Sequence, residues 1–121
     1  CDHIDLRSVS PLDWEMIFES VNRTGKLLVI DSSSKSFSVS SEIIARTTMQ
    51  SFNFLKAAPV QLALPDNPSP TSFALTKPYY NGAKEVYHKA YRLIFEREAT
   101  DIEISENEFH DVPGDWFKGP F

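Results

Sequence analysis

Thr24-Gly25-Lys26-Leu27-Leu28-Val29-Ile30-Asp31 is the stretch of sequence that decides the fold. Four consecutive large apolar residues, 27–30, follow a glycine and end at an acid, a pattern typical of a strand buried on both faces of a parallel sheet. A helical pattern precedes this stretch, and a serine-rich segment and a second helical pattern follow it. The order helix, strand, loop and helix predicts an α/β fold with 27–30 as its central strand.

The residues before this stretch predict a short strand and a helix. Residues 4–9 alternate apolar and polar side chains, as in a strand near a sheet edge. Ser10 and Pro11 then provide an N-cap and a first helical residue, and Gly25 provides a left-handed stop, so we expect a helix over about 11–23. Its apolar residues follow helical spacing and form one buried face: Trp14, Ile17, Phe18 and Val21.

The residues after the central strand continue the alternation of strands and helices. The serine-rich segment 32–40 predicts a loop at the carboxyl end of the strand, with Ser40 or Ser41 capping the next helix. Such loops hold ligands in doubly wound folds. Further elements are expected as follows: a helix over 42–56, a strand over 60–64, a proline-rich loop over 65–72 and an amphipathic helix over about 86–94, after Asn81-Gly82.

We therefore expect one doubly wound α/β domain over 1–121, with a mostly parallel sheet of three to five strands and helices on both faces. Residues 96–121 differ in composition, being acidic first and aromatic at the end, with a short strand around 102–104. The acidic part carries seven acids: Glu96, Glu98, Asp101, Glu103, Glu106, Glu108 and Asp111. It is interpreted either as a solvated surface or as a docking face for a basic partner.

Composition excludes several classes of partner. The net charge of −5 and the pI near 5.1 disfavour nucleic acid and anionic membranes, which select clustered Lys and Arg. No apolar run reaches the length of about 18 residues that a membrane span needs. Cys1 is the single cysteine and cannot form an internal disulfide, so we expect a cytoplasmic protein, or a mitochondrial-matrix protein in a eukaryote.

Residue patterns for common chemistries are missing from the sequence. Four scattered glycines give no phosphate-binding motif, and three distant histidines give no metal spacing. Asp31 ends its strand where phosphoacceptor receiver domains place an aspartate, but the acidic pair that such domains need after their first strand is replaced by Ser8-Val9-Ser10. A helix-capping or interface role for Asp31 is the better interpretation. No catalytic, cofactor-binding or metal-binding residue is assigned.

Several segments, in order and at family spacing, resemble a known domain. These are Ile4-Asp5-Leu6-Arg7-Ser8-Val9-Ser10-Pro11-Leu12-Asp13, residues 19–31, Ser41-Glu42-Ile43-Ile44-Ala45, Pro59-Val60, residues 65–70, Asp111-Val112-Pro113 and Lys118-Gly119-Pro120-Phe121. Together they resemble the transketolase-type C-terminal domain of the β subunit of thiamine-diphosphate-dependent 2-oxo acid dehydrogenases, the pyruvate, branched-chain and acetoin dehydrogenase group. Two departures stand out: residues 36–40 lack the glycines usual in the family, and we expect the family's leading strand and helix to be missing.

The resemblance implies an assembly role. Thiamine diphosphate and magnesium would belong to the parent enzyme, with none in this chain, and the fragment alone would be inactive. Its partners would be the α subunit, a second β subunit in a homodimer, and the basic subunit-binding domain of the acyltransferase core. The carboxylate of Phe121 and the acidic residues are candidates for that last contact.

We predict two groups of interface residues. Asp66, Pro68 and Pro70 would shape an interface loop, and Trp116, Phe117 and Phe121 would be anchors, because buried aromatics dominate interface energies. Arg7 is interpreted as a member of a structural ion pair. A rival hypothesis is a free-standing regulatory or binding domain of the same fold that holds a small anion between the serine-rich and proline-rich loops. Exposure of a sheet edge would also make the fragment dimerise or aggregate.

Overall fold

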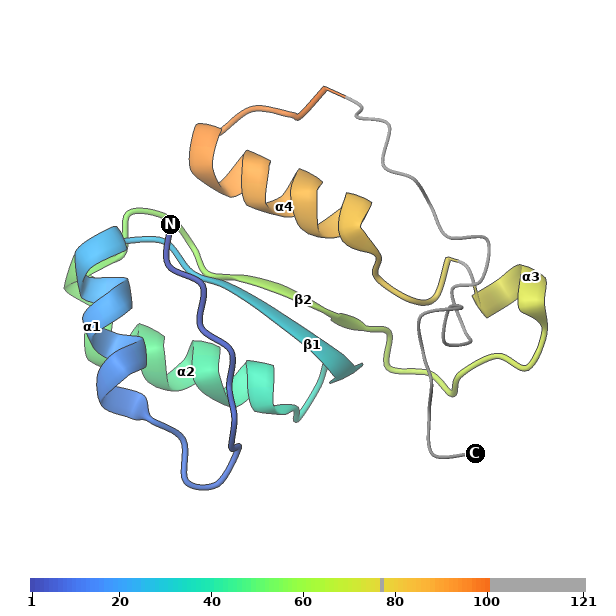
Figure 1. Cartoon of the computed structure of the whole chain (residues 1–121), viewed down its shortest axis with the longest axis horizontal. Coiled ribbons are helices and arrows are strands. Elements are labelled where there is room, and N and C mark those ends of the chain that lie inside the picture. The colour runs from blue at the N-terminus through green and yellow to red at the C-terminus, as the bar shows by residue number, and fades with distance from the viewer. Residues whose placement is uncertain (77, 101–121) are drawn as a thin grey trace.

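The computed structural model describes residues 1–76 and 78–100 of the chain. α2 covers one face of a parallel sheet and α4 covers the other, while α1 packs on α2 (Figure 1). This arrangement confirms the predicted α/β class with helices on both faces of the sheet. The elements in chain order are α1 (Trp14–Thr24), β1 (Leu28–Ser34), α2 (Val39–Ser51), the 3-10 helix η1 (Phe52–Phe54), β2 (Val60–Leu64), α3 (Phe73–Thr76) and α4 (Ala83–Phe95).

The sheet is smaller than predicted in the part of the chain that the structure describes. β1 and β2 pair in parallel, with Leu28 opposite Val60 and Ile30 opposite Leu62, and these two strands replace the expected three to five. β1 is also less buried than predicted, since Leu28 and Val29 are half-buried and the side chain of Ile30 is 56% exposed. The prediction that 27–30 is buried on both faces is therefore wrong, and β1 has one partner among the described strands instead of the predicted central position.

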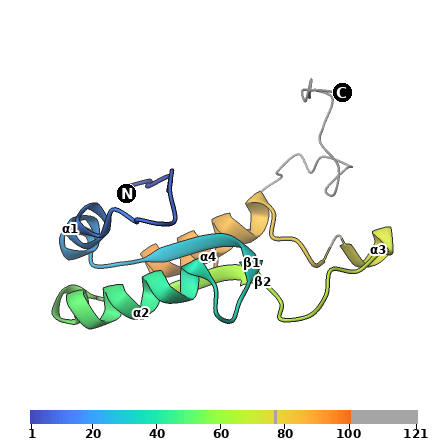
Figure 2. The same ribbon diagram turned by 90° about the horizontal axis from the view of Figure 1, so that it is seen from below.

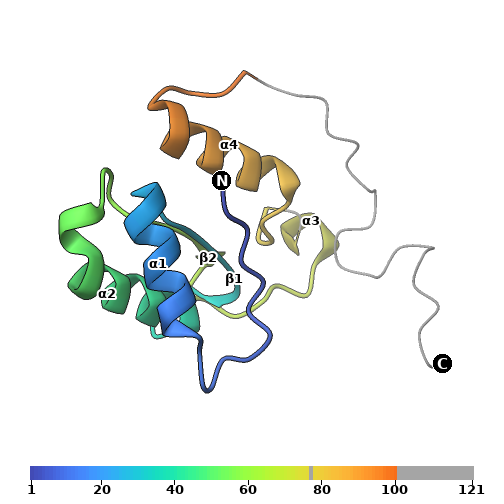
Figure 3. The same ribbon diagram turned by 60° about the vertical axis from the view of Figure 1, so that its left-hand side comes forward.

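The N-terminal segment is extended but is not the predicted strand. Residues 4–9 form no ladder with the sheet, and the segment runs past α1 (Figure 3). Asp2 fastens it to α1 by accepting hydrogen bonds from Ser20 and Arg23. The predicted ion pair of Arg7 is present, with Asp5 at 3.4 Å, but both side chains are exposed and such pairs add little stability.

α1 begins later than predicted and ends where predicted. Its N-cap is Asp13, whose carboxylate accepts a hydrogen bond from the Met16 amide at 3.0 Å, while Ser10 and Pro11 lie before the helix. Gly25 ends the helix in the left-handed conformation at φ +76°, and its amide donates to the Val21 carbonyl at 2.7 Å. The glycine stop is thus confirmed, and the choice of cap residue is corrected.

The core lies between the sheet and the α1–α2 pair. Its fully buried apolar side chains are Ile17, Val21, Ile43 and Leu62. Thr47 and Ser51, one turn apart on α2, are also fully buried, and their hydroxyls have no hydrogen-bond partner among the residues that the structure describes. Unpaired buried hydroxyls carry a desolvation cost of about 1–3 kcal/mol each, so this packing is less favourable than an apolar one of the same shape.

The second half of the described chain matches the predictions more closely. β2 has the predicted bounds, residues 65–72 form neither helix nor strand, and α4 follows Gly82. The short helix α3 was not expected, and it lies beyond the carboxyl ends of the strands (Figures 1 and 2). Lys26 holds the end of α4, because its ammonium donates to the carbonyls of Leu93 at 2.8 Å and Ile94 at 3.0 Å.

Candidate functional site

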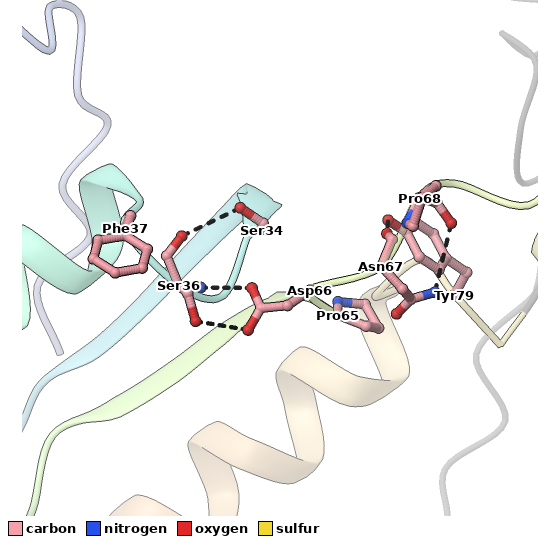
Figure 4. Close-up of a pocket in the computed structure, with 8 residues that line it drawn as sticks. All are labelled: Ser34, Ser36, Phe37, Pro65, Asp66, Asn67, Pro68 and Tyr79. Carbon is pink, nitrogen blue, oxygen red and sulfur yellow. Dashed lines mark hydrogen bonds between the residues drawn. The ribbon is translucent and has the colours of Figure 1, made fainter.

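Two loops meet at the carboxyl ends of β1 and β2, and this edge is where doubly wound folds place their ligands. We call residues 35–38 the serine loop and residues 65–72 the proline loop. A hollow of about 450 Å³ lies between them, and Figure 4 shows its lining. The lining residues are Ser34, Ser36, Phe37, Pro65, Asp66, Asn67, Pro68 and Tyr79.

Asp66 joins the two loops. Its carboxylate accepts one hydrogen bond from the Ser36 amide at 2.8 Å and one from the Ser36 hydroxyl at 2.6 Å (Figure 4). These two bonds, with help from the charge of Lys35, lower the pKa of Asp66 below its ordinary value. The carboxylate is therefore ionised at neutral pH and acts as a clamp on the serine loop.

Asp31 makes a second clamp, on the residues that flank the serine loop. Its carboxylate accepts hydrogen bonds from the amides of Ser33 at 2.9 Å and Ser40 at 3.1 Å. Partial desolvation raises the pKa of Asp31, but the bonds from Ser33 and Ser40 outweigh it, so the pKa lies below its ordinary value. Since Ser40 lies in the first turn of α2, the predicted helix-capping role of Asp31 is confirmed.

Serine hydroxyls and one glutamine complete this network. Ser38, rather than the predicted Ser40 or Ser41, is the N-cap of α2, because its hydroxyl accepts from the Ser41 amide at 3.3 Å. From β2, the Gln61 side chain donates to the Lys35 carbonyl at 2.8 Å and to the Ser40 hydroxyl at 2.9 Å. Strand, loop and helix are thus joined by polar contacts at this edge.

The network has a chemical consequence for ligands. Amides at the start of a helix and in tight loops are the usual donors to phosphate and other anions. Here the donors of Ser33, Ser36 and Ser40 already serve the carboxylates of Asp31 and Asp66. A small anion at this edge would have to displace a carboxylate and would meet its negative charge.

Phe37 also lies at this edge, and no sequence pattern singled it out. Its backbone is left-handed at φ +55°, a conformation that costs a non-glycine residue about 1–2 kcal/mol. The residue is 103% exposed, so its side chain gains no packing against the described residues that would offset that cost. The ring lies on the far side of Ser36 from Asp66 (Figure 4). The absence of glycines in 36–40 was the one sequence signal for this strain.

A second hollow, of about 460 Å³, lies beside Phe37 on the side of α1 and α2. Arg46 stacks over the Trp14 ring at 4.6 Å and pairs with Glu42 at 2.7 Å, so these three side chains form one wall of the hollow. The lining combines apolar, hydroxyl and charged side chains: Val9, Ser10, Pro11, Leu12, Trp14, Phe37, Ser38, Val39, Glu42 and Arg46.

The structure brings together only part of the predicted interface residues. Asp66 and Pro68 line the first hollow, whereas Pro70 is half-buried and lies outside its lining. Trp116, Phe117 and Phe121, with the predicted strand at 102–104, lie outside the described residues. Ser36 and Tyr79 were missed, and Tyr79 supports the proline loop by donating from its hydroxyl to the Asn67 carbonyl at 2.9 Å.

The start of the acidic segment is partly neutralised within the chain. Glu96 lies 3.5 Å from the ammonium of Lys26, and Glu98 lies 3.2 Å from the guanidinium of Arg92. The other five acids of the segment lie outside the described residues. Within residues 1–76 and 78–100, no group of three His, Cys, Asp or Glu side chains could hold a metal ion. No helix in the same ranges is long and apolar enough to cross a membrane.

Comparison with known proteins gives one family match and a set of relatives. The family model described as "Transketolase, C-terminal domain" matches residues 1–86. The chain is 38% identical over 91 residues to the pyruvate dehydrogenase E1 component subunit beta of Mycoplasma genitalium, covering 75% of this chain and 26% of that protein.

Two further relatives agree with this match. The corresponding subunit of Mycoplasma pneumoniae is 54% identical over 56 residues, 46% of this chain and 17% of that protein. The acetoin:2,6-dichlorophenolindophenol oxidoreductase subunit beta of Cupriavidus necator is 36% identical over 83 residues, 69% of this chain and 25% of that protein. The match therefore spans about a quarter, or less, of the length of these relatives.

Proposed function

Because the chain belongs to the transketolase C-terminal domain family, we propose that it is the subunit-contacting C-terminal domain of the β subunit of a thiamine-diphosphate-dependent 2-oxo acid dehydrogenase. The relatives named as β subunits of pyruvate dehydrogenase and of an acetoin oxidoreductase support this assignment. The parent enzyme would oxidatively decarboxylate a 2-oxo acid. This domain would contribute contacts to the α subunit and to a second β subunit.

One observation supports a role in subunit contact rather than in ligand binding or catalysis. At the edge where ligands bind in doubly wound folds, the chain's own carboxylates are occupied: Asp66 holds Ser36 of the serine loop, and Asp31 holds the residues that flank the loop, Ser33 and Ser40. Loops fixed in this way present a rigid surface, and rigid loops lose little entropy when a partner binds. The same clamps argue against the rival function, a free-standing small-anion site.

The described residues do not fit the cofactor of the parent enzyme. Thiamine diphosphate binds through a divalent cation, which takes oxygen ligands, but both Asp66 oxygens accept hydrogen bonds from Ser36. No group of three acidic or histidine ligands occurs within 1–76 and 78–100. When bound in the parent enzyme, the cofactor supplies the carbanion chemistry of decarboxylation. This domain would help to hold together the subunits that form the cofactor site.

A domain exchange tests the proposal. The segment of the Mycoplasma genitalium β subunit that matches this chain, 91 residues long, is replaced by the corresponding residues of this chain and the chimera is produced with its α subunit. We expect the chimera to co-purify with the α subunit and to oxidise pyruvate. The same β subunit with the segment deleted is the control, and it should fail to assemble. A folded chimera that does not bind the α subunit would contradict the proposal.

A titration distinguishes the proposed contact domain from the rival small-anion-binding domain. Phosphate and a nucleoside diphosphate are added to the isotopically labelled chain, and the amide resonances of Ser33, Ser36 and Ser40 are followed by NMR. We expect no saturable shift at millimolar ligand, because those amides already donate to carboxylates. A saturable shift confined to these amides would support the small-anion domain.

A further inference from the structure

We propose that the Asp66 clamp holds the backbone of Phe37 in its strained, left-handed conformation, and that loss of the clamp lets residues 36 and 37 relax into a second form. We call these two forms of the serine loop the held form and the released form. The proposal goes beyond the proposed function and does not rest on it, because it concerns a conformational equilibrium within this chain alone.

The strain in the held form lies at Phe37. Its φ is +55°, a conformation in which the Cβ atom of an L-residue crowds the following carbonyl oxygen. This crowding favours an ordinary conformation at negative φ by about 5- to 30-fold in the equilibrium constant. Because the residue is fully exposed, packing of its side chain does not select the left-handed form. The conformation must therefore be imposed by the neighbouring residues.

The residues on each side of Phe37 are fixed by hydrogen bonds. Before it, the amide and the hydroxyl of Ser36 donate to the two oxygens of Asp66, at 2.8 and 2.6 Å (Figure 4). The Ser36 carbonyl also accepts a longer bond, of 3.3 Å, from the Ser34 hydroxyl. After it, Ser38 is the N-cap of α2. Strained residues persist where the surrounding structure fixes them in this way.

Asp66 is the fixed point whose loss would release the strain. Ser38 stays in place while α2 is folded, and the Lys35 amide is tied to β2 by its bond to the Leu64 carbonyl at 2.8 Å. Asp66, by contrast, is exposed and belongs to a loop 30 residues further along the chain. Hydrogen bonds to a charged group favour the bonded form by about tenfold or more each, so two of them outweigh the strain at Phe37. Without them, the strain decides the balance.

Release would change the surface at this edge. Ser36, Phe37 and Asp66 all line the first hollow, so the released form would have a hollow of different shape. Any group that bound the Asp66 carboxylate more tightly than Ser36 does would favour the released form, because it would bind that form alone. The clamp thus makes the shape of the serine loop depend on whether the Asp66 carboxylate is engaged by Ser36.

Comparison of glycine with alanine at position 37 tests the proposal, because the sign of the difference reports φ. Glycine is favoured over alanine at positive φ, whereas alanine is favoured at negative φ because it restricts the unfolded chain. Urea denaturation is measured for Phe37→Gly and Phe37→Ala in the 121-residue chain, each with Asp66 and with Asp66→Ala. With Asp66, we expect the unfolding constant of Phe37→Gly to be about fivefold smaller than that of Phe37→Ala. With Asp66→Ala, we expect it to be about two- to fivefold larger.

Glu96 provides the matched control. It is the other non-glycine residue at positive φ among the described residues, at +57°, and it ends α4, where its amide donates to the Arg92 carbonyl at 2.9 Å. The end of α4 holds this conformation and not the serine loop. Glu96→Gly should therefore be more stable than Glu96→Ala both with Asp66 and with Asp66→Ala.

NMR gives a direct measurement of the same change. Backbone J couplings of Phe37 distinguish positive from negative φ, and they should indicate positive φ in the wild type and negative φ in Asp66→Ala. The proposal would be overturned by positive φ in both chains, by a preference for glycine at position 37 that persists in Asp66→Ala, or by a preference for alanine that is already present with Asp66. A reversal that also occurs at position 96 would overturn it as well. No α subunit is used, so these results are independent of the domain exchange.

Discussion

Helices α2 and α4 lie on opposite faces of the same sheet and have the same length, 13 residues, but they are held in different ways. α2 buries Ser40, Ile43, Thr47 and Ser51 fully, whereas α4 has no fully buried residue. α4 is fixed at its two ends instead, by Lys26 at its carboxyl end and by Asn81, whose amide donates to the Ala63 carbonyl at 3.1 Å before its start.

The difference shows that an amphipathic pattern predicts which face of a helix points inward but not how deeply it is buried. α4 carries the more regular apolar face, including the ring series Tyr87, Tyr91 and Phe95, with neighbouring centroids 5.8 and 4.6 Å apart. α2 has the weaker pattern and the deeper burial, because small side chains let it approach the sheet and α1 closely. Stability should therefore reside mainly on the α2 face.

Truncation of one isoleucine on each helix gives the largest expected difference. Ile43→Ala removes a side chain that is 3% exposed and should lower the free energy of unfolding by about 2–4 kcal/mol. Ile94→Ala removes one that is 48% exposed and should cost less than about 1 kcal/mol. Urea denaturation of both variants measures the contrast. Equal losses would mean that α4 belongs to the core as fully as α2 does.

Removal of the Lys26 charge should loosen α4 and leave α2 unchanged. Lys26→Met keeps most of the apolar stem but loses the bonds to Leu93 and Ile94, with an expected cost of about 1–2 kcal/mol. Hydrogen exchange should accelerate at the α4 amides and not at those of α2. Lys89→Met, a change at an exposed position of α4, is the control and should have little effect. Protection lost equally from both helices would show that the two faces unfold as one unit.

The smallest expected effect comes from Asp31, whose clamp joins β1 to the start of α2. Asp31→Asn should lower the free energy of unfolding at neutral pH by about 0.5–1 kcal/mol. Because the pKa of Asp31 is lower in the folded chain than its ordinary value of 3.8, this contribution is complete above that value and is lost as the pH falls through the folded pKa.

Urea midpoints at a series of pH values check the Asp31 prediction. The wild type and Asp31→Asn should differ at pH 7 and converge in acid. A difference that is independent of pH would mean that the side chain acts through packing rather than through its charge.

Much of the fold followed from local sequence. The bounds of β2, the position of α4 after Gly82 and the stop at Gly25 were predicted correctly, because proline, glycine and helical spacing act locally. The strand at 4–9 was wrong, since alternation indicates a face but does not supply a partner strand. The start of α2 was misplaced because several serines in a row can each serve as a cap.

The candidate site was less predictable than the fold. Asp66 was predicted as an interface residue, which stays a prediction, and its bond to Ser36 joins positions 30 residues apart that no spacing rule connects. Phe37 was missed because a left-handed aromatic contradicts ordinary propensity, and only the lack of glycines in 36–40 pointed to that loop. Sites built from contacts between distant loops need the three-dimensional structure.

The pairing of β1 with β2 contains a register shift, between Ile30 and Ser34 of β1. Three residues of β1 separate Ile30 from Ser34, but a single residue of β2 separates their partners, Leu62 and Leu64. The surplus of about 6–7 Å of chain is taken up by a bulge within β1, because Ser34 pairs with Leu64 before the serine loop begins. An insertion or deletion between 31 and 33 would therefore change the size of this bulge while the pairs at 28–30 and at Ser34 kept their partners, so chain length could vary here independently of the core.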